Sequence, residues 1–243
     1  MEISKRAQNK ARKKAQIIKA AKKLVRKNGN AEFTMPELAS EAKVALVTPY
    51  TYFQSKAGVL TEVLDPSHAL DSASAWSDDT DHNDGLERVM AFARSRCDRY
   101  VQDEALYRPV LYALSKLDPD ATAEAEQADD WLTLWEEGLT LAAKKGQIDK
   151  SVNTILAAHT VRSAFVAVLE RWTRKSITND LLILETQMSV SLHLAGLSQK
   201  PKDRKKWYQV FIASQDQFMR ERGMAVDFSL ADSPQLAPMV PGY

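Results

Sequence analysis

The sequence predicts an all-α protein of about nine or ten helices, and two observations support this fold class. Only eight glycines and nine prolines interrupt the 243 residues. Apolar residues recur with the 3.6-residue period of amphipathic helices, whereas the alternating pattern of a half-buried strand is hard to find. The composition, 44% hydrophobic and 27% charged, is that of an ordinary globular protein with one large domain or two modest ones.

The first predicted helix follows a basic N-terminal segment, residues 1–10, which we interpret as an arm. The helix is expected to bury the apolar residues Ala11, Ala15, Ile18, Ala21 and Val25 on one face. The pair Asn28–Gly29 favours the left-handed conformation that ends many helices.

A short second helix is predicted from a capping signature. In the segment Thr34-Met35-Pro36-Glu37, Thr34 is the N-cap, Glu37 stands three residues later, and Pro36 is tolerated in the first turn. Phe33 and Leu38 flank the cap as a hydrophobic staple. We expect this helix to begin at Met35 and to run through Ala42.

A four-residue turn, Lys43 to Leu46, precedes a third predicted helix. That helix must begin within about a turn before Pro49, because proline lacks the N–H that a helix interior needs. Ser55 is expected to cap a fourth helix whose first residue is Lys56. Two short helices joined by a tight turn, the second rich in hydroxyls and aromatics, are typical of a helix-turn-helix motif, here about residues 34–53.

Charge is divided unevenly along the chain. Residues 1–60 carry 13 Lys/Arg against 4 Asp/Glu, and residues 61–243 carry 20 against 28. A basic module joined to an acidic one indicates a polyanion partner for the first, although charge alone fits a solvated lysine-rich face equally well. Beside a helix-turn-helix motif, we interpret the cluster Lys5, Arg6, Lys10, Arg12, Lys13 and Lys14 as a flexible arm on DNA phosphates or in the minor groove.

Many positions of residues 33–60 agree with one known pattern at fixed spacing. They are Phe33-Thr34-Met35, Glu37-Leu38-Ala39, Glu41-Ala42 and Val44, followed by Thr48, Tyr50, Tyr52-Phe53, Ser55-Lys56 and Leu60. In these residues the chain resembles the DNA-binding domain of the tetracycline-repressor (TetR/AcrR) family. The resemblance covers roughly residues 11–71. It implies a three-helix DNA-binding domain there, and a larger helical-bundle domain for ligand binding and dimerisation at residues 72–222.

The resemblance also implies roles for single residues. Val44 and Phe53 match core positions, and Thr48, Tyr50, Tyr52 and Lys56 match positions that touch the DNA backbone or base edges. Hydroxyls that donate to phosphate and a lysine at a helix N-terminus make this physically sensible. The residues expected to contact DNA are Thr34, Lys43, Leu46, Val47, Thr48, Tyr50, Tyr52 and Lys56. The alternative for Tyr50 and Tyr52 is a purely structural place in the core.

The turn departs from the family pattern. The family often has Gly, Ser and Gly where Lys43, Ala45 and Val47 stand. A lysine in a turn that needs positive φ costs about 1 kcal/mol relative to glycine, but it adds a cation near the DNA backbone. Because no Arg, Asn or Gln occurs from residue 43 to 53, we expect the DNA sequence to be read partly through apolar contacts and DNA shape.

Helical periodicity continues in the second half. One helix is expected to bury Ile155, Ala158, Val161, Phe165, Val168 and Trp172, and another Leu181, Leu184, Met188, Leu192 and Ala195. Less regular helices are predicted over roughly residues 56–75, 84–103, 105–116, 120–145 and 203–222. Residues 77–84 are predicted to be a loop, and the proline-containing tail, residues 223–243, to be extended or disordered.

The sequence holds no recognisable catalytic constellation, so we expect no enzyme, no cofactor and no metal site. The four histidines lack metal-ligand spacing, and neither a glycine-rich phosphate loop nor a Gly-x-Ser-x-Gly elbow occurs. A single cysteine, Cys97, excludes an internal disulfide, and a reducing cytoplasm is the natural compartment. No apolar run approaches the roughly 18 residues that span a bilayer.

Bulky side chains over roughly residues 84–173 favour an apolar ligand pocket, with plain core packing as the competing interpretation. The predicted pocket wall is Trp131, Trp135, Phe165 and Arg162. Arg108 also falls beside an apolar face, and a buried arginine needs an internal carboxylate or a ligand anion. The faces of about residues 154–173 and 178–196 are predicted to form a homodimer, as the last long helix pair does in the family.

The sequence therefore favours a dimeric repressor that a small hydrophobic ligand releases from a palindromic operator in double-stranded DNA. The alternative is an architectural or cell-division DNA-binding protein whose helical half binds a protein partner. A cavity open to solvent in the second half would favour the first function, and a filled core would favour the second.

Overall fold

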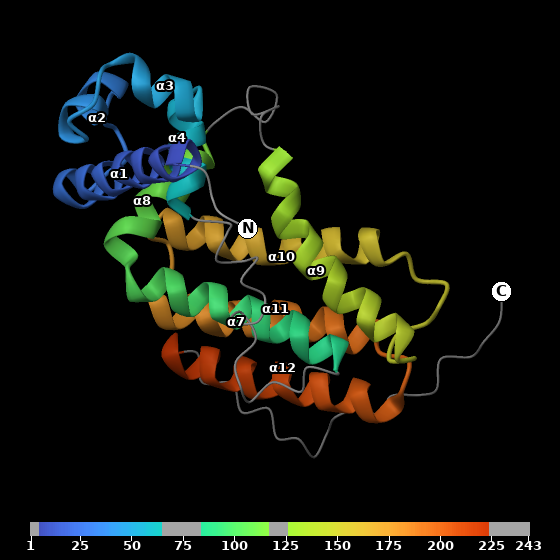
Figure 1. Cartoon of the computed structure of the whole chain (residues 1–243). Coiled ribbons are helices and arrows are strands. Elements are labelled where there is room, and N and C mark those ends of the chain that lie inside the picture. Colours follow the sequence, from blue (N-terminus) through green and yellow to red (C-terminus); the bar gives the residue numbers. More distant parts are fainter. Residues whose placement is uncertain (1–4, 65–83, 117–125, 224–243) are drawn as a thin grey trace.

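The computed structural model describes residues 5–64, 84–116 and 126–223, which form ten α-helices and no strand. Figure 1 shows four helices gathered in a small N-terminal domain at one end of a larger bundle made by the other six. The predicted all-α class is confirmed. The domain boundary expected after residue 71, residues 1–4 of the arm and residues 224–243 of the tail lie outside the described residues.

The N-terminal domain consists of α1 (Lys5–Asn28), α2 (Met35–Glu41), α3 (Val47–Phe53) and α4 (Lys56–Leu64). Its core contains Ile17, Ala21 and Val25 of α1, which are fully buried, together with apolar side chains of α2 and α4. Gly29 ends α1 with a φ of 68°, as the sequence predicted. The predicted face was wrong at Ala11 and Ala15, which are exposed.

The interpretation of residues 1–10 as an arm needs a correction. Residues 5–10 are the first turns of α1 and are helical. The segment contains no glycine or proline before Gly29, so nothing in the chain stops the helix from extending towards the N-terminus. The basic residues Lys10, Arg12, Lys13 and Lys14 therefore lie on a helix and not on an extended arm.

The second domain consists of α7 (Gly85–Gln102), α8 (Glu104–Leu114), α9 (Glu126–Lys144), α10 (Thr154–Thr173), α11 (Asn179–Leu197) and α12 (Pro201–Glu221). Helix α11 lies at its centre and packs against α7, α10 and α12. Its apolar residues accordingly surround the helix instead of forming one stripe. None of the described helices is both long and apolar enough to cross a membrane.

Two glycines let α7 and α9 approach closely. A Cβ atom on Gly85 would lie 2.2 Å from the backbone nitrogen of Ala142, and one on Gly138 would lie 2.7 Å from a methyl carbon of Val89. Any larger residue at Gly85 would collide with backbone atoms, which cannot move aside cheaply. The pair α7–α9 thus forms a close-packed wall of the bundle.

The apolar faces predicted for the two late helices are mostly buried. Ala158, Val161, Phe165, Val168 and Trp172 of α10 and Leu181, Leu184 and Ala195 of α11 are all in the core. The prediction was wrong at Ile155 and Leu192, which are exposed to solvent. Both residues lie at the edge of their stripe, where periodicity alone does not separate the core from the surface.

Helix α8 joins the two domains. It contacts α1 and α4 on one side and α7 and α10 on the other. Arg26, near the end of α1, donates to the carboxylate of Asp103, the residue that links α7 to α8. Because Asp103 is also the N-cap position of α8, this ion pair ties the N-terminal domain to the start of that helix.

A network of polar side chains continues from the start of α8 into the bundle. Arg108 pairs with Glu104 (3.1 Å) and donates to the amide oxygen of Asn179 (3.2 Å), while its guanidinium stacks over the ring of Trp172. The same amide oxygen accepts the indole N–H of Trp172 (2.8 Å), and the amide nitrogen donates to Glu104 (2.7 Å). The half-buried Arg108 therefore has a carboxylate of its own chain as its partner, although Glu104 is itself 40% exposed.

Candidate nucleic-acid interface

The second helix of the motif is fixed at its start by the predicted capping box. The hydroxyl oxygen of Thr34 accepts the backbone N–H of Glu37 (3.3 Å), and the Glu37 carboxylate accepts the backbone N–H of Thr34 (2.7 Å). These bonds to Thr34 lower the pKa of Glu37 below its ordinary value. Phe33 and Leu38, the predicted staple, are both fully buried. The Thr34 hydroxyl also donates to Glu37, so it serves first as a cap.

The turn between α2 and α3 has the geometry of a Schellman motif. The backbone N–H of Val44 donates to the carbonyl of Ala39, and that of Lys43 donates to the carbonyl of Ser40, both at 3.0 Å. Lys43 takes a φ of 52°, in the left-handed region that the sequence departure suggested. Its side chain is exposed. The turn thus presents a cation at the edge of the motif.

Helix α3 presents two contrasting faces. Pro49 and Phe53 are buried against the domain, and Val44, just before the helix, packs beside them. On the opposite face Leu46, Val47 and Tyr50 are 54%, 67% and 45% exposed. Burial of Phe53 and Val44 confirms their predicted core role, whereas the sequence did not indicate that Pro49 would be buried.

The remaining predicted contacts lie around this exposed face. Thr48 and Tyr52 are half-buried, and Tyr52 packs on the core with its ring 6.3 Å from that of Phe53. The hydroxyl of Thr51 donates to the carbonyl of Val47 (3.0 Å), which leaves its methyl group free at the surface. Tyr52 therefore combines packing with a position beside the face, while Tyr50 projects from it.

Lys56 begins α4, as predicted, and Ser55 accepts the backbone N–H of Gly58 (3.1 Å) as its cap. The Lys56 ammonium lies 5.1 Å from the centre of the Phe33 ring. Partial burial lowers its pKa, and the carboxylates of Glu32 and Glu37 oppose that shift. Lys56 thus sits over the aromatic core next to a helix N-terminus, where a phosphate would be favoured.

The cations of α1 divide into two groups. Three make ion pairs within the protein: Lys14 with Glu62 (2.8 Å), Lys23 with Glu41 (2.5 Å) and Arg26 with Asp103. Among the described residues, Lys10, Arg12, Lys13, Lys19 and Lys27 are exposed and form no ion pair. Lys14, Lys19, Lys22 and Arg26 also rim a shallow groove of about 470 Å³ along α1. The positive charge available to a polyanion is therefore smaller than the sequence count suggested.

One contact that stabilises the motif could not be read from the sequence. The side-chain amide of Gln16 on α1 donates to the carbonyl of Ala42 at the end of α2 (2.6 Å). This bond satisfies one of the carbonyls that a helix end leaves free. Together with the Lys23–Glu41 pair, it anchors α2 on α1.

Comparison with known families agrees with this geometry. Residues 17–63 match the model described as "Bacterial regulatory proteins, tetR family". The N-terminal domain is a TetR-family DNA-binding domain. The chain is therefore a DNA-binding transcriptional regulator, and the resemblance predicted from residues 33–60 is confirmed. A search among curated proteins finds no relative that matches the chain.

Solved structures of TetR-type regulators share the fold over most of the chain. The fatty acid degradation regulator FadR from Bacillus halodurans has a TM-score of 0.59 and 23% identity, covering 75% of this chain and 98% of that one. FadR from Bacillus subtilis, solved with stearoyl-CoA, has a TM-score of 0.60 and 20% identity, with the same coverage. TylP from Streptomyces fradiae has a TM-score of 0.59 and 14% identity, covering 86% and 99%. At these identities the likeness shows the fold alone.

The predicted pocket residues of this TetR-type chain lie on α9 and α10. Trp135 and Phe165 are buried with ring centres 5.6 Å apart, and Phe92 of α7 meets Trp135 edge-on at 4.9 Å. Arg162 is half-buried, and the side chain of Trp131 lies outside the described residues. Two of the four residues are thus neighbours in the core, and their role in a pocket stays a prediction. Within the described residues, no group of three or more His, Cys, Asp or Glu could hold a metal ion.

Proposed function

We propose that this protein is a dimeric repressor that binds a palindromic operator through α3 and leaves it when a small hydrophobic ligand binds the helical domain. The observation that carries this proposal is the exposed face of Leu46, Val47 and Tyr50 in a TetR-family domain. Three large apolar side chains together in solvent are typical of a binding surface. The proposed DNA contacts are Thr34, Lys43, Leu46, Val47, Thr48, Tyr50, Tyr52 and Lys56.

The side chains of α3 determine how an operator would be read. Val47 and Leu46 offer methyl groups to thymine methyls in the major groove, and the Tyr50 hydroxyl offers a donor to a base edge or phosphate. Helix α3 carries no guanidinium or amide side chain, so bidentate base recognition is not available from it. Lys43 and the unpaired cations of α1 supply phosphate contacts on either side. DNA shape then contributes to specificity, because a groove of the wrong width would misplace these contacts.

The proposed dimer uses the outer surface of α10. Ile155, Leu156 and Val166 of this helix are large apolar residues exposed to solvent, and Leu192 of α11 is exposed as well. Helix α12 packs on α11, so α10 provides most of the exposed apolar area in the faces predicted at residues 154–173 and 178–196. A two-fold dimer would place two copies of α3 on successive half-sites of a palindrome.

Charge placed on the outer face of α10 should therefore separate the dimer. The double change Leu156→Glu and Val166→Glu should shift sedimentation at micromolar concentration from about twice the 27.2 kDa chain mass to the mass of one chain. Operator affinity should fall at least tenfold, because only one recognition helix remains on each particle. The control Tyr112→Glu with Tyr208→Glu adds the same charge at exposed aromatic positions on α8 and α12. An unchanged sedimentation coefficient in the α10 variant would show that the outer face of α10 does not form the dimer interface.

The proposed effector is a small hydrophobic molecule. The bundle fold is shared with FadR solved with stearoyl-CoA and with RolR solved with resorcinol (TM-score 0.58, 16% identity, covering 83% of this chain and 95% of that one). The proposed site lies among Trp131, Trp135, Phe165 and Arg162, between α9 and α10. Helix α8 contacts both α10 and the DNA-binding domain, and it offers a route by which a shifted bundle would change the spacing of the two α3 helices.

Ligand control is tested by following two signals in one titration. Fatty acyl thioesters and phenolic compounds are added to the protein–operator complex while tryptophan fluorescence and operator occupancy are recorded. A compound that quenches or shifts tryptophan emission should lower operator affinity by about 5–150-fold, the usual range of such coupling. Ligands that bind tightly without changing operator affinity would refute the sensor role.

One observation favours a second candidate, in which the helical domain binds a protein partner. Trp135 of α9 contacts the ring of Phe92 on α7, with centres 4.9 Å apart, and the ring of Phe165 on α10, with centres 5.6 Å apart. This aromatic packing favours the architectural alternative, for which a filled core is expected. In that case no hydrophobic compound would release the operator, and a partner protein would change operator occupancy instead.

A further inference from the structure

The helical domain carries a concentrated basic surface at the ends of two helices. It consists of Lys144, Lys145 and Lys150 at and after the end of α9, and Lys200, Lys202, Arg204, Lys205 and Lys206 at the start of α12; we call it the distal basic surface. Only Asp149 and Asp203 stand within these two segments. The other positions of residues 61–243 carry 12 Lys/Arg against 26 Asp/Glu, so this cluster opposes the charge of its own domain.

Backbone contacts hold the two basic segments side by side. Ile148 and Ser198 form an antiparallel bridge, and the N–H of Gln199 donates to the carbonyl of Gln147 (2.8 Å). The Lys200 ammonium donates to the carbonyl of Lys145 (3.3 Å). The buried Gln147 in turn accepts the N–H of Gly85 (3.0 Å) and donates to Asp84 (2.8 Å). The segments are therefore part of one ordered surface fixed to α7.

The charges of this surface are largely free. All eight cations are exposed, and the only ion pair they make among the described residues joins Lys206 to Glu87. Asp149 accepts from the backbone and hydroxyl of Ser151, contacts that lower its pKa and occupy it within its own turn. The first turn of α12 has no side-chain cap, so its backbone N–H groups add to the positive potential.

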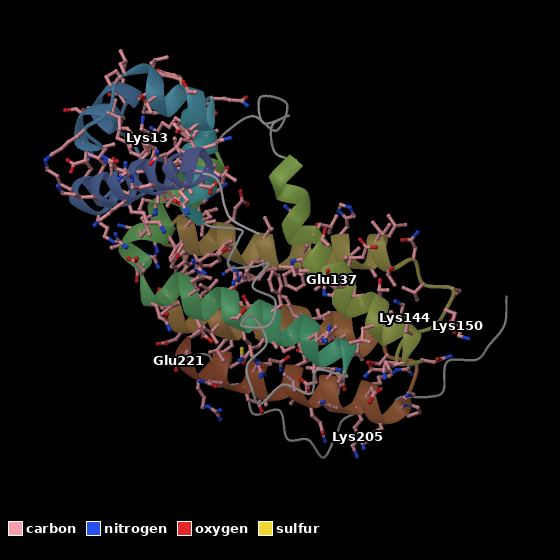
Figure 2. All side chains as sticks on the ribbon, viewed as in Figure 1. Lys13, Glu137, Lys144, Lys150, Lys205 and Glu221 are labelled. Carbon is pink, nitrogen blue, oxygen red and sulfur yellow. The ribbon has the colours of Figure 1, made fainter. Side chains whose placement is uncertain are left out.

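The position of the surface is as informative as its charge. In Figure 2, Lys144, Lys150 and Lys205 lie together at the end of the bundle farthest from Lys13 in the DNA-binding domain. Glu221, at the other end of α12, lies on the opposite side of the view. A DNA duplex held by α3 would not reach these lysines, so the cluster is not an extension of the operator interface.

We propose that the distal basic surface binds the phosphate backbone of a second DNA duplex without sequence preference, so that one regulator bridges two DNA segments. The proposal rests on the proposed function, because α3 must hold the operator. Lysine ammonium groups bind phosphate as point charges, and neither basic segment offers exposed large apolar side chains that would insert into a membrane. A duplex that is already held by α3 also raises the local concentration of DNA.

A bridging assay on the full chain tests this proposal. An operator duplex is first selected by the protein from a random-sequence pool. This duplex is attached to beads and saturated with protein. The amount of a labelled unrelated duplex that the beads capture is then measured per molecule of protein retained. The triple change Lys144→Glu, Lys150→Glu and Lys205→Glu should lower capture at least tenfold while the operator fills as in the wild type. A steep loss of capture with salt is also expected, since each phosphate contact releases counterions. The control Lys116→Glu, Lys175→Glu and Arg220→Glu makes the same charge change at exposed positions elsewhere in the domain and should capture normally.

Two measurements distinguish the failure of operator binding by α3 from the failure of DNA binding by the distal basic surface. Protein retained on the operator reports the α3 interface by itself, and failure there contradicts the proposed function. The distal surface is then tested in a chain with Tyr50→Ala and Lys56→Ala, whose remaining low-salt binding to unrelated duplex should fall with the triple change to the level that Lys43 and the cations of α1 support. Equal binding by both chains would overturn the proposal. Binding to phosphatidylglycerol vesicles that depends on the three lysines, without duplex capture, would also overturn it and assign the surface to a membrane.

Discussion

Replacing Tyr50 by alanine should lower operator affinity by about 5–150-fold, the 1–3 kcal/mol by which a good contact to a base edge discriminates. Tyr50 lies on the exposed face of α3 with Leu46 and Val47, and it is 45% exposed. Affinity for an unrelated duplex should change far less, because phosphate contacts from Lys43 and α1 remain. Fluorescence anisotropy with both duplexes measures the difference.

The prediction has a matched control and a contrasting variant. Tyr208→Ala removes a tyrosine of nearly equal exposure, 43% against 45%, at the far end of the molecule, and it should leave both affinities unchanged. Lys56→Met keeps the stem over Phe33 but removes the charge, so operator and unrelated duplex should both weaken to a similar extent. If Tyr50→Ala binds the operator like the wild type, α3 is not the recognition helix.

Replacing Asn179 by leucine should lower the free energy of unfolding by about 2–4 kcal/mol. The amide group of Asn179 bonds to Trp172, Arg108 and Glu104, and its loss leaves the buried indole N–H of Trp172 and the largely buried guanidinium of Arg108 without this partner. Each unsatisfied buried group costs about 1–3 kcal/mol. The Nε of Arg108 has no hydrogen-bond partner even in the intact network, so the site has little capacity to rearrange. Denaturant unfolding followed by circular dichroism measures the change.

The neighbouring residue offers the control for this substitution. Asp180→Leu makes a similar change of shape in the first turn of α11 at an exposed position and should cost less than about 1 kcal/mol. The network begins at Glu104, next to the Asp103 that pairs with Arg26 of the DNA-binding domain. We therefore also expect the Asn179→Leu protein to respond less to any effector. Equal stability of the two variants would show that the network is not structural.

The predictions that held depended on short-range signals. Thr34 and Glu37 are three residues apart, and their reciprocal bonds follow from that spacing alone. Lys43 at positive φ and Pro49 in the first turn of α3 follow from local sterics in the same way. The resemblance supplied the packing of Val44 and Phe53, because a motif of fixed geometry places its core positions.

The features that the sequence did not reveal depend on partners distant in the chain. Arg26 meets Asp103 across 77 positions, and Gln16 meets Ala42 across 26. Ile155 and Leu192 follow the apolar period, yet they are exposed because none of the helices that the structure describes covers them. The distal basic surface was hidden for the same reason, since its two segments are far apart in the chain and meet through the Ile148–Ser198 bridge and the hydrogen bonds beside it. Periodicity describes the faces of one helix and carries no information about contacts between segments that are distant in the chain.

Site-directed DNA cleavage tests the central claim, that α3 enters the major groove, most directly. Cys97 is fully buried and burial raises the pKa of its thiol to about 12, so it should stay unmodified in the native protein. A cysteine introduced by Val47→Cys would then carry an iron chelate alone, with Lys116→Cys, just after α8, as a control. We expect a chelate at position 47 to cut the DNA within the major groove of two operator half-sites, and a chelate at position 116 to make no cut. Absence of cuts from position 47, with cleavage instead from a chelate at Lys205→Cys, would contradict it.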